Sequence, residues 1–222
     1  GPDNQAIGVV GDIDVDAIEA KIRALWADVP ARENRGERPL YSVDDNQEPI
    51  IAVVTDNEAQ VTRIELTYKK QPLPRELRGT DVAYVVDIAN SLICDMFDHR
   101  VEELSMDPNA SFVGGGSYYG ELVKEKDQFL AVYVAKAGQE KKAYADLLFQ
   151  LEKMRRYGFT NAELERVKTE KLAAYEKYYN ERNTNRNISY TREYIRHFLD
   201  GEVIPGIAWE YETLQQLLPM LD

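Results

Sequence analysis

Hydrophobic residues recur at three- and four-residue steps over residues 80–105, which predicts one long amphipathic helix. The apolar positions are Val82, Val85, Ala89, Leu92, Ile93, Met96, Val101 and Leu104. A turn is predicted at 106–109, and two strands follow at 112–119 and 128–136. We expect the helix to bury its apolar stripe against these strands.

Further strands are predicted at 5–10, 50–55 and 60–70, and further helices at 14–30, 141–157, 160–182, 189–199 and 209–218. The buried face of the first of these helices is expected at Ile18, Ile22, Leu25 and Trp26, and that of the second at Tyr144, Leu147, Leu148, Leu151 and Met154. Thr160 and Glu163 have the spacing of a capping box, and Gly158 is placed to end the preceding helix. Strands followed by paired helices, without regular βαβ alternation, predict an α+β fold. Its mainly antiparallel sheet carries helices on one face.

Composition divides the chain into three parts. Residues 1–30 contain one strand and one helix, too little for a core of their own, and are interpreted as the end of a preceding domain. Residues 31–49 are rich in charged residues, asparagine and proline, and are predicted to be a linker. Residues 50–222 then form the main domain.

The charge and the single cysteine exclude several classes of protein. The 222 residues have a formal net charge of −12, which argues against nucleic acid or an anionic membrane surface as the main partner. No apolar run approaches 18 residues, so membrane insertion is not expected. Cys94 lies in the long helix and is interpreted as a small core residue.

Candidate catalytic chemistry is sparse, because the chain has only two histidines. His99-Arg-Val-Glu-Glu103 is one residue short of the helical zinc signature His-x-x-Glu-His, so a metal pair would have to be His99 with Glu103. The favoured interpretation is a charged helix face on which Arg100 and Glu103 pair. His197 is interpreted as structural. No catalytic residue and no metal ligand is assigned.

Three successive glycines in the predicted strand 112–119 are the strongest functional signal. Glycine weakens a strand unless another backbone has to lie close to it. The run Phe112-Val-Gly-Gly-Gly116 is therefore either a bare edge with which an extended peptide pairs, or a bulge or close helix crossing. The residues leave both interpretations open.

Several segments together resemble the M16 metallopeptidases, the family of pitrilysin and insulin-degrading enzyme. Pro2-Asp-Asn4 followed by Ile7-Gly-Val-Val-Gly-Asp-Ile-Asp14 resembles the family's last strand and helix of a catalytic domain. Gly158-Phe-Thr160 with Glu163-Leu164 is similar to a Gly-Phe-Thr-x-x-Glu-Leu segment of the next domain. The spacing to Tyr194-Ile-Arg-His-Phe-Leu-Asp-Gly-Glu202 and Pro205-Gly206 is similar to that in bacterial PqqL-type members.

The resemblance implies a fragment of a zinc endopeptidase with the LuxS-like metallohydrolase type of fold. Residues 50–222 would be its non-catalytic second domain, inactive alone, and residues 1–30 the tail of the catalytic domain. Zinc would lie in that upstream domain, which is the implied partner together with peptide substrates. A periplasmic or cell-envelope location is expected by the same resemblance.

By resemblance to insulin-degrading enzyme, Phe112, Val113, Gly114, Gly115 and Gly116 would bind extended peptide inside the peptide chamber. A β-branched residue at Gly115 is then expected to weaken peptide binding and to leave the fold intact. The alternative is a purely structural domain that docks the catalytic domain and has no affinity for peptide.

Overall fold

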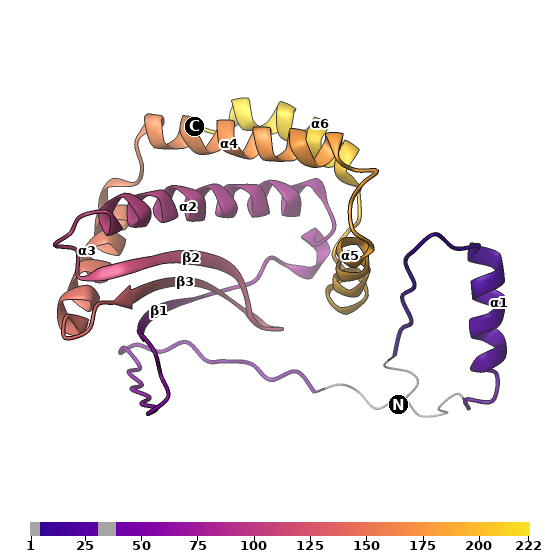
Figure 1. Ribbon diagram of the computed structural model, residues 1–222, viewed down its shortest axis with the longest axis horizontal. Helices are drawn as coiled ribbons and strands as arrows, with labels where there is room; N and C mark the ends of the chain where they lie inside the picture. Colours follow the sequence, from indigo (N-terminus) through magenta and orange to yellow (C-terminus); the bar gives the residue numbers. More distant parts are fainter. Residues whose placement is uncertain (1–4, 31–38) are drawn as a thin grey trace. The chain divides into compact units, whose positions relative to one another are not determined.

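A three-stranded antiparallel sheet is the centre of the larger part of the fold (Figure 1). The computed structural model describes residues 5–30 and 39–222, which divide into two units that are treated separately. The sheet unit comprises Leu40–Ala173 and Gln215–Asp222. The helical unit comprises Ala174–Leu214 and the described part of Gly1–Pro39.

The sheet unit contains the three strands of the described residues and two complete α-helices. The strands are β1 (Thr62–Lys70), β2 (Phe112–Val123) and β3 (Lys126–Ala135), and the helices are α2 (Asp81–Ser105) and α3 (Glu140–Tyr157). Short 3-10 turns, η2 and η3, lie at Arg75–Leu77 and Leu218–Met220. The first part of α4 (Asn161–Asn180) also belongs here, and α2 lies between it and the sheet (Figure 1).

The order of strands is β1-β3-β2, so β3 is central and pairs antiparallel with both neighbours. Alternate residues of β3 are buried on one face, as expected when one face of a sheet is covered. These residues are Phe129, Ala131, Tyr133 and Ala135, and they form one core cluster with Phe97 and Val101 of α2 and Ala143, Leu147 and Leu151 of α3. The predicted α+β fold is confirmed.

Tyr133 carries an unsatisfied polar group into this core. Its side chain is fully buried and stacks on Phe112 with the ring centroids 3.8 Å apart. Burial raises the pKa of the phenol, and its oxygen has no hydrogen-bond partner among the described residues. A buried phenol without a partner costs free energy, because the hydrogen bonds that it makes to water in the unfolded chain are lost.

Tyr133→Phe is therefore expected to raise the free energy of unfolding by about 1 kcal/mol, measured by urea denaturation. The matched control is Tyr118→Phe, because Tyr118 lies on the neighbouring strand with an exposed side chain. The control is expected to change nothing. A less stable Tyr133→Phe protein would show that the phenol has a partner in solution.

The predicted helix end and capping box both form at the junction between α3 and α4. Gly158 has a φ of 63° and donates its backbone N–H to Met154, which ends α3. The backbone N–H of Thr160 donates to Glu163 at 2.7 Å, and that of Glu163 donates to the Thr160 hydroxyl at 3.3 Å. This is the predicted capping box, which satisfies backbone donors at the start of α4.

Two predicted strands are wrong. Residues 5–10 and 50–55 form no strand, although both are apolar and rich in β-branched residues. A strand needs a neighbour for its backbone groups, and neither segment has one within the described chain. The side chains of Ile50, Ile51, Val53 and Val54 are 78% to 91% exposed.

The helical unit contains α1 (Val15–Leu25), α5 (Asn187–Asp200), the end of α4 and most of α6 (Ile207–Leu217). Asp14 caps α1 by accepting the backbone N–H of Ala17 at 3.0 Å. The predicted burial of Ile18, Ile22, Leu25 and Trp26 is wrong, because no residue of α1 is buried and Trp26, which follows it, is 49% exposed. The predicted start of the main domain at residue 50 stays a prediction.

Candidate functional site

The candidate site lies on β2, an outer strand of the sheet. In the order β1-β3-β2, strand β2 pairs with β3 on one side, and no described strand pairs with its other side. The five candidate residues differ in their surroundings. Phe112 is 3% exposed and belongs to the core, whereas Val113 is exposed. Phe112 therefore holds the strand on the core, and the residues that follow it are accessible.

The three glycines differ in the space that is available for a side chain. A Cβ added at Gly115 would lie 2.1 Å from the carbonyl oxygen of Val132 and 2.8 Å from the ring of Tyr133. At Gly116 it would lie 3.3 Å from the Asp98 carboxylate, whereas at Gly114 it would meet nothing within 4 Å. The pairing register also shifts between Phe112 and Gly114, which is a bulge or similar irregularity.

The bulge, one of the two structural explanations of the glycine run, is thus present as a shift in register, and the close approach at Gly115 is to strand β3 and not to a helix. The expectation that a β-branched residue at Gly115 leaves the fold intact is contradicted, since its Cβ would collide with the backbone of β3. Gly114 is the position at which a side chain fits. Neither observation bears against peptide pairing, which uses backbone groups at the outer edge of the strand.

Helix α2 places two side chains against the outer edge of β2. The Ser117 hydroxyl donates to Asp98 at 2.8 Å, and the backbone N–H of Ser117 donates to the same carboxylate. The backbone N–H of Tyr119 donates to the sulfur of Cys94. Sequence reasoning missed these contacts, because nothing local relates Asp98 to a residue 19 positions away.

Burial raises the pKa values of both α2 side chains. Desolvation is the largest cause at Asp98, and the hydrogen bonds from Ser117 oppose it. The same cause keeps the Cys94 thiol protonated at neutral pH, which agrees with its interpretation as a core residue and not a nucleophile. Cys94 is half-buried and packs against the core cluster.

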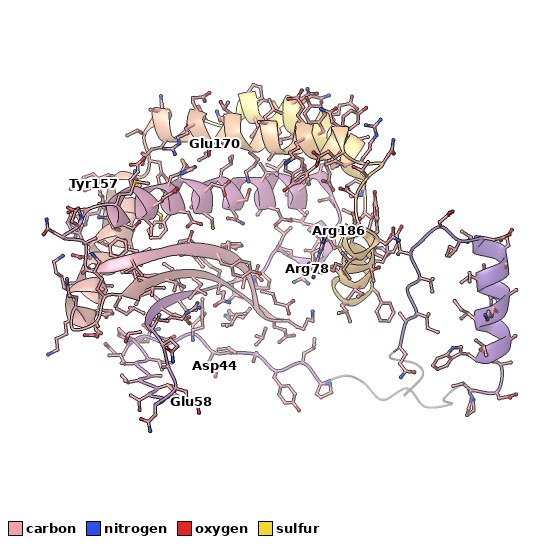
Figure 2. The ribbon with its side chains drawn as sticks, in the orientation of Figure 1. Asp44, Glu58, Arg78, Tyr157, Glu170 and Arg186 are labelled. Atoms are coloured by element: carbon pink, nitrogen blue, oxygen red, sulfur yellow. The ribbon has the colours of Figure 1, made fainter. Side chains whose placement is uncertain are left out.

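His99 and Glu103, the candidate metal pair, contact charged side chains of α4. His99 Nε2 lies 2.6 Å from Glu170, which Figure 2 labels on α4, and its Nδ1 lies 3.2 Å from the guanidinium of Arg166. The same guanidinium donates to Glu103 at 3.0 Å. Within residues 5–30 and 39–222, no three His, Cys, Asp or Glu side chains are grouped to hold a metal ion.

Arg100 does not pair with Glu103 as predicted. It donates to Glu163 of the capping box and to the Gly158 carbonyl, and its guanidinium lies 4.3 Å from the centroid of the Phe159 ring. A cavity of about 560 Å³ lies beside it, with Tyr157, labelled in Figure 2, in its wall. The charges of Arg100 and Glu163 neutralise each other in that wall, so the cavity offers no unpaired charge from this pair.

Comparison with known proteins identifies a family. The model of the family domain described as "Peptidase M16 inactive domain" matches residues 1–171. A curated relative, the "Zinc protease PQQL-like" of Arabidopsis thaliana, is 25% identical over 220 residues, which is 98% of this chain. The match covers 20% of that relative, so the chain spans about a fifth of its length.

Solved structures share the fold. The periplasmic protease PqqL from Escherichia coli matches with a TM-score of 0.80 and 18% identity, over 96% of this chain and 23% of that chain. A predicted insulinase family protease from Yersinia pestis matches with a TM-score of 0.76 and 13% identity, over 96% and 45% of the two chains. Among the described residues, no helix is long and apolar enough to cross a membrane.

Proposed function

Because the chain belongs to the M16 peptidase family and matches its inactive domain, we propose that it binds extended peptides along the outer edge of β2. In this proposal it encloses the peptide together with an upstream catalytic domain, which holds the zinc ion. The chain itself contains no His-x-x-Glu-His segment and would be inactive alone. The periplasmic location of the relative PqqL suggests the cell envelope for this chain.

The outer edge of β2 at residues 113–116, with which no described strand pairs, is the observation that carries the proposal. An outer strand presents backbone N–H and C=O groups that an extended peptide can pair with. No hydrogen bond from a described side chain reaches the backbone of residues 113–116. Backbone pairing accepts varied side chains, as a domain that holds peptides of varied sequence requires.

The exposure of the surrounding residues also favours an edge that is open to solvent. Val113 and Tyr118 on β2 are exposed, and Gly114 has no neighbour within 4 Å of an added Cβ. A peptide approaching the glycines would therefore meet little steric obstruction from β2 itself. Exposed apolar side chains next to free backbone groups are typical of strand-addition sites.

Pairing of this kind predicts that the effect of backbone methylation on binding alternates from one peptide residue to the next. Alternate N–H groups of an added strand point towards β2, and the others point away. Methylation of one backbone nitrogen that points towards β2 is expected to weaken binding at least about tenfold, because a hydrogen bond is lost and the strands are forced apart. Methylation of the next nitrogen is expected to change binding little.

The probe is a series of blocked nine-residue peptides of threonine, valine and lysine, each methylated at one nitrogen, with binding measured by fluorescence anisotropy. The alternate positions serve as controls for one another. Binding that is equally sensitive at neighbouring positions would contradict strand addition.

A second candidate function is docking of a catalytic domain without affinity for peptide. The exposed side chains of Ile50, Ile51, Val53 and Val54 favour it, since a cluster of exposed apolar residues is a common sign of a protein interface. Absence of binding to every unmethylated peptide would favour this function over the first.

A further inference from the structure

We infer that Asp98 fixes the register of a bound peptide by closing the outer edge of β2 at Ser117, so that a peptide seated on the glycines pairs with residues 113–116 and extends no further. This inference rests on the proposed function. It assigns Asp98 a positioning role, because its carboxylate contacts β2 and no part of the peptide.

Alternation along β2 shows which backbone groups face outwards. In an antiparallel strand, the N–H and C=O of every second residue point to the same edge. Ser117 donates its N–H to Asp98 on α2, and Tyr119 donates its N–H to Cys94 on the same helix, so both face away from β3. Pairing with β3 runs without a shift from Gly114 to Glu121. Gly115 therefore faces the same outer edge.

The outward N–H groups thus differ in hydrogen bonding between Gly115 and Ser117. At Ser117 and Tyr119 the outward N–H groups are already hydrogen-bonded to α2. At Gly115 no described side chain takes the equivalent group. A peptide can pair with Gly115 without breaking a hydrogen bond from any described side chain, but one that extends to Ser117 has to displace Asp98.

Displacing Asp98 is unfavourable because its carboxylate accepts hydrogen bonds from both the hydroxyl and the backbone N–H of Ser117. One oxygen accepts from the Ser117 hydroxyl at 2.8 Å. The same hydroxyl lies 3.4 Å from the carbonyl oxygen of Cys94. A half-buried carboxylate that loses these donors keeps the cost of desolvation without the hydrogen bonds that offset it.

The inference predicts how affinity depends on the length of the peptide. Blocked peptides of threonine, valine and lysine, four to ten residues long, are titrated against the 222-residue chain and its variants by calorimetry. In the wild-type chain, affinity is expected to stop rising once the peptide pairs with residues 113–116. In Asp98→Ala, the one additional pair at Ser117 is expected to raise affinity about threefold to tenfold, whereas the Tyr119 N–H stays bonded to Cys94.

Two further variants separate positioning from a general loss of structure. Asp98→Asn keeps an acceptor for the Ser117 N–H and is expected to behave as the wild type. Glu102→Ala removes an exposed carboxylate one turn further along α2, whose nearest described partner is His99 at 3.8 Å, and is expected to change nothing. Hydrogen exchange of the Ser117 amide checks the contact directly, since Asp98→Ala should remove its protection.

The outcomes are distinguishable. If peptides bind but affinity depends on length in the same way in wild type and Asp98→Ala, the inference is wrong and the proposed function stands. A Ser117 amide that is unprotected in the free wild-type chain also overturns the inference. If no peptide of any length binds either protein, the proposed function fails and the inference fails with it.

Discussion

Gly115→Val is expected to lower the free energy of unfolding by about 3 kcal/mol. The reason is the close approach of β3: a Cβ at this position would lie 2.1 Å from the Val132 carbonyl oxygen, and a backbone atom cannot move aside as a flexible side chain does. The strand would have to shift away from β3, which weakens the pairing that holds the central layer of the fold. Urea denaturation followed by circular dichroism measures the loss.

Gly114→Val is the matched control, because the two glycines are adjacent in the same strand and an added Cβ at Gly114 meets nothing within 4 Å. Its free energy of unfolding is expected to stay within about 0.5 kcal/mol of the wild type. Equal stability of the two variants would contradict the close approach of β2 and β3 at Gly115.

Glu163→Ala is expected to cost about 3 kcal/mol at neutral pH. Glu163 accepts two hydrogen bonds from Arg100 and one from the backbone N–H of Thr160. The Arg100 side chain is only 14% exposed, and its Nη1 already lacks a partner among the described residues. Removing the carboxylate would leave a nearly buried guanidinium without its counter-charge, and would also break the capping box of α4.

The same pair predicts a dependence on pH. Hydrogen bonds from Arg100 lower the pKa of Glu163 from 4.5 to about 2. A carboxylate with a lowered pKa in the folded state stabilises the protein above its unfolded pKa, and this contribution is lost as pH falls through the folded pKa. The difference between wild type and Glu163→Ala should therefore shrink between about pH 4.5 and pH 2, measured by urea denaturation.

Glu152→Ala is the control for this experiment. Hydrogen bonds from Arg155 and Arg156 lower the pKa of Glu152 to about 2 as well, but all three side chains are exposed to solvent. Water and salt screen exposed ion pairs, so this variant is expected to change stability little at any pH. A loss as large as that of Glu163→Ala would contradict the role of burial.

Elements with signals close together in the sequence were predicted well. The helix predicted over residues 80–105 is α2, Asp81–Ser105, and the capping box at Thr160 and Glu163 forms as expected. These signals lie within one helix or one turn, so the chain specifies them without reference to distant residues. The α+β arrangement followed from the same local signals, because strands precede paired helices.

Contacts between distant segments could not be predicted in the same way. Arg100 was expected to pair with Glu103 one turn away, yet its partner is Glu163, 63 residues along the chain. Residues 50–55 have the composition of a strand, but a strand forms only where a neighbour exists to pair with it. Helix α1 likewise has an amphipathic pattern and no buried residue.

Some features of the candidate site could likewise be predicted from the sequence, and others required the structure. The glycine run was recognised from sequence, and so were its two interpretations, a bare edge for a peptide or a structural bulge. The distinction among the glycines, with Gly115 against Val132 and Gly114 in open space, required the position of β3. The contact of Asp98 with Ser117 required the position of α2.

The most direct test of the proposed function is a titration of the isotopically labelled chain with an unmethylated peptide, followed by the amide resonance of Gly115. This resonance is expected to shift, reach saturation and gain protection from hydrogen exchange, because the outward N–H of Gly115 receives a partner. Saturable binding that leaves the Gly115 amide unchanged, or no binding at millimolar peptide, would contradict the account.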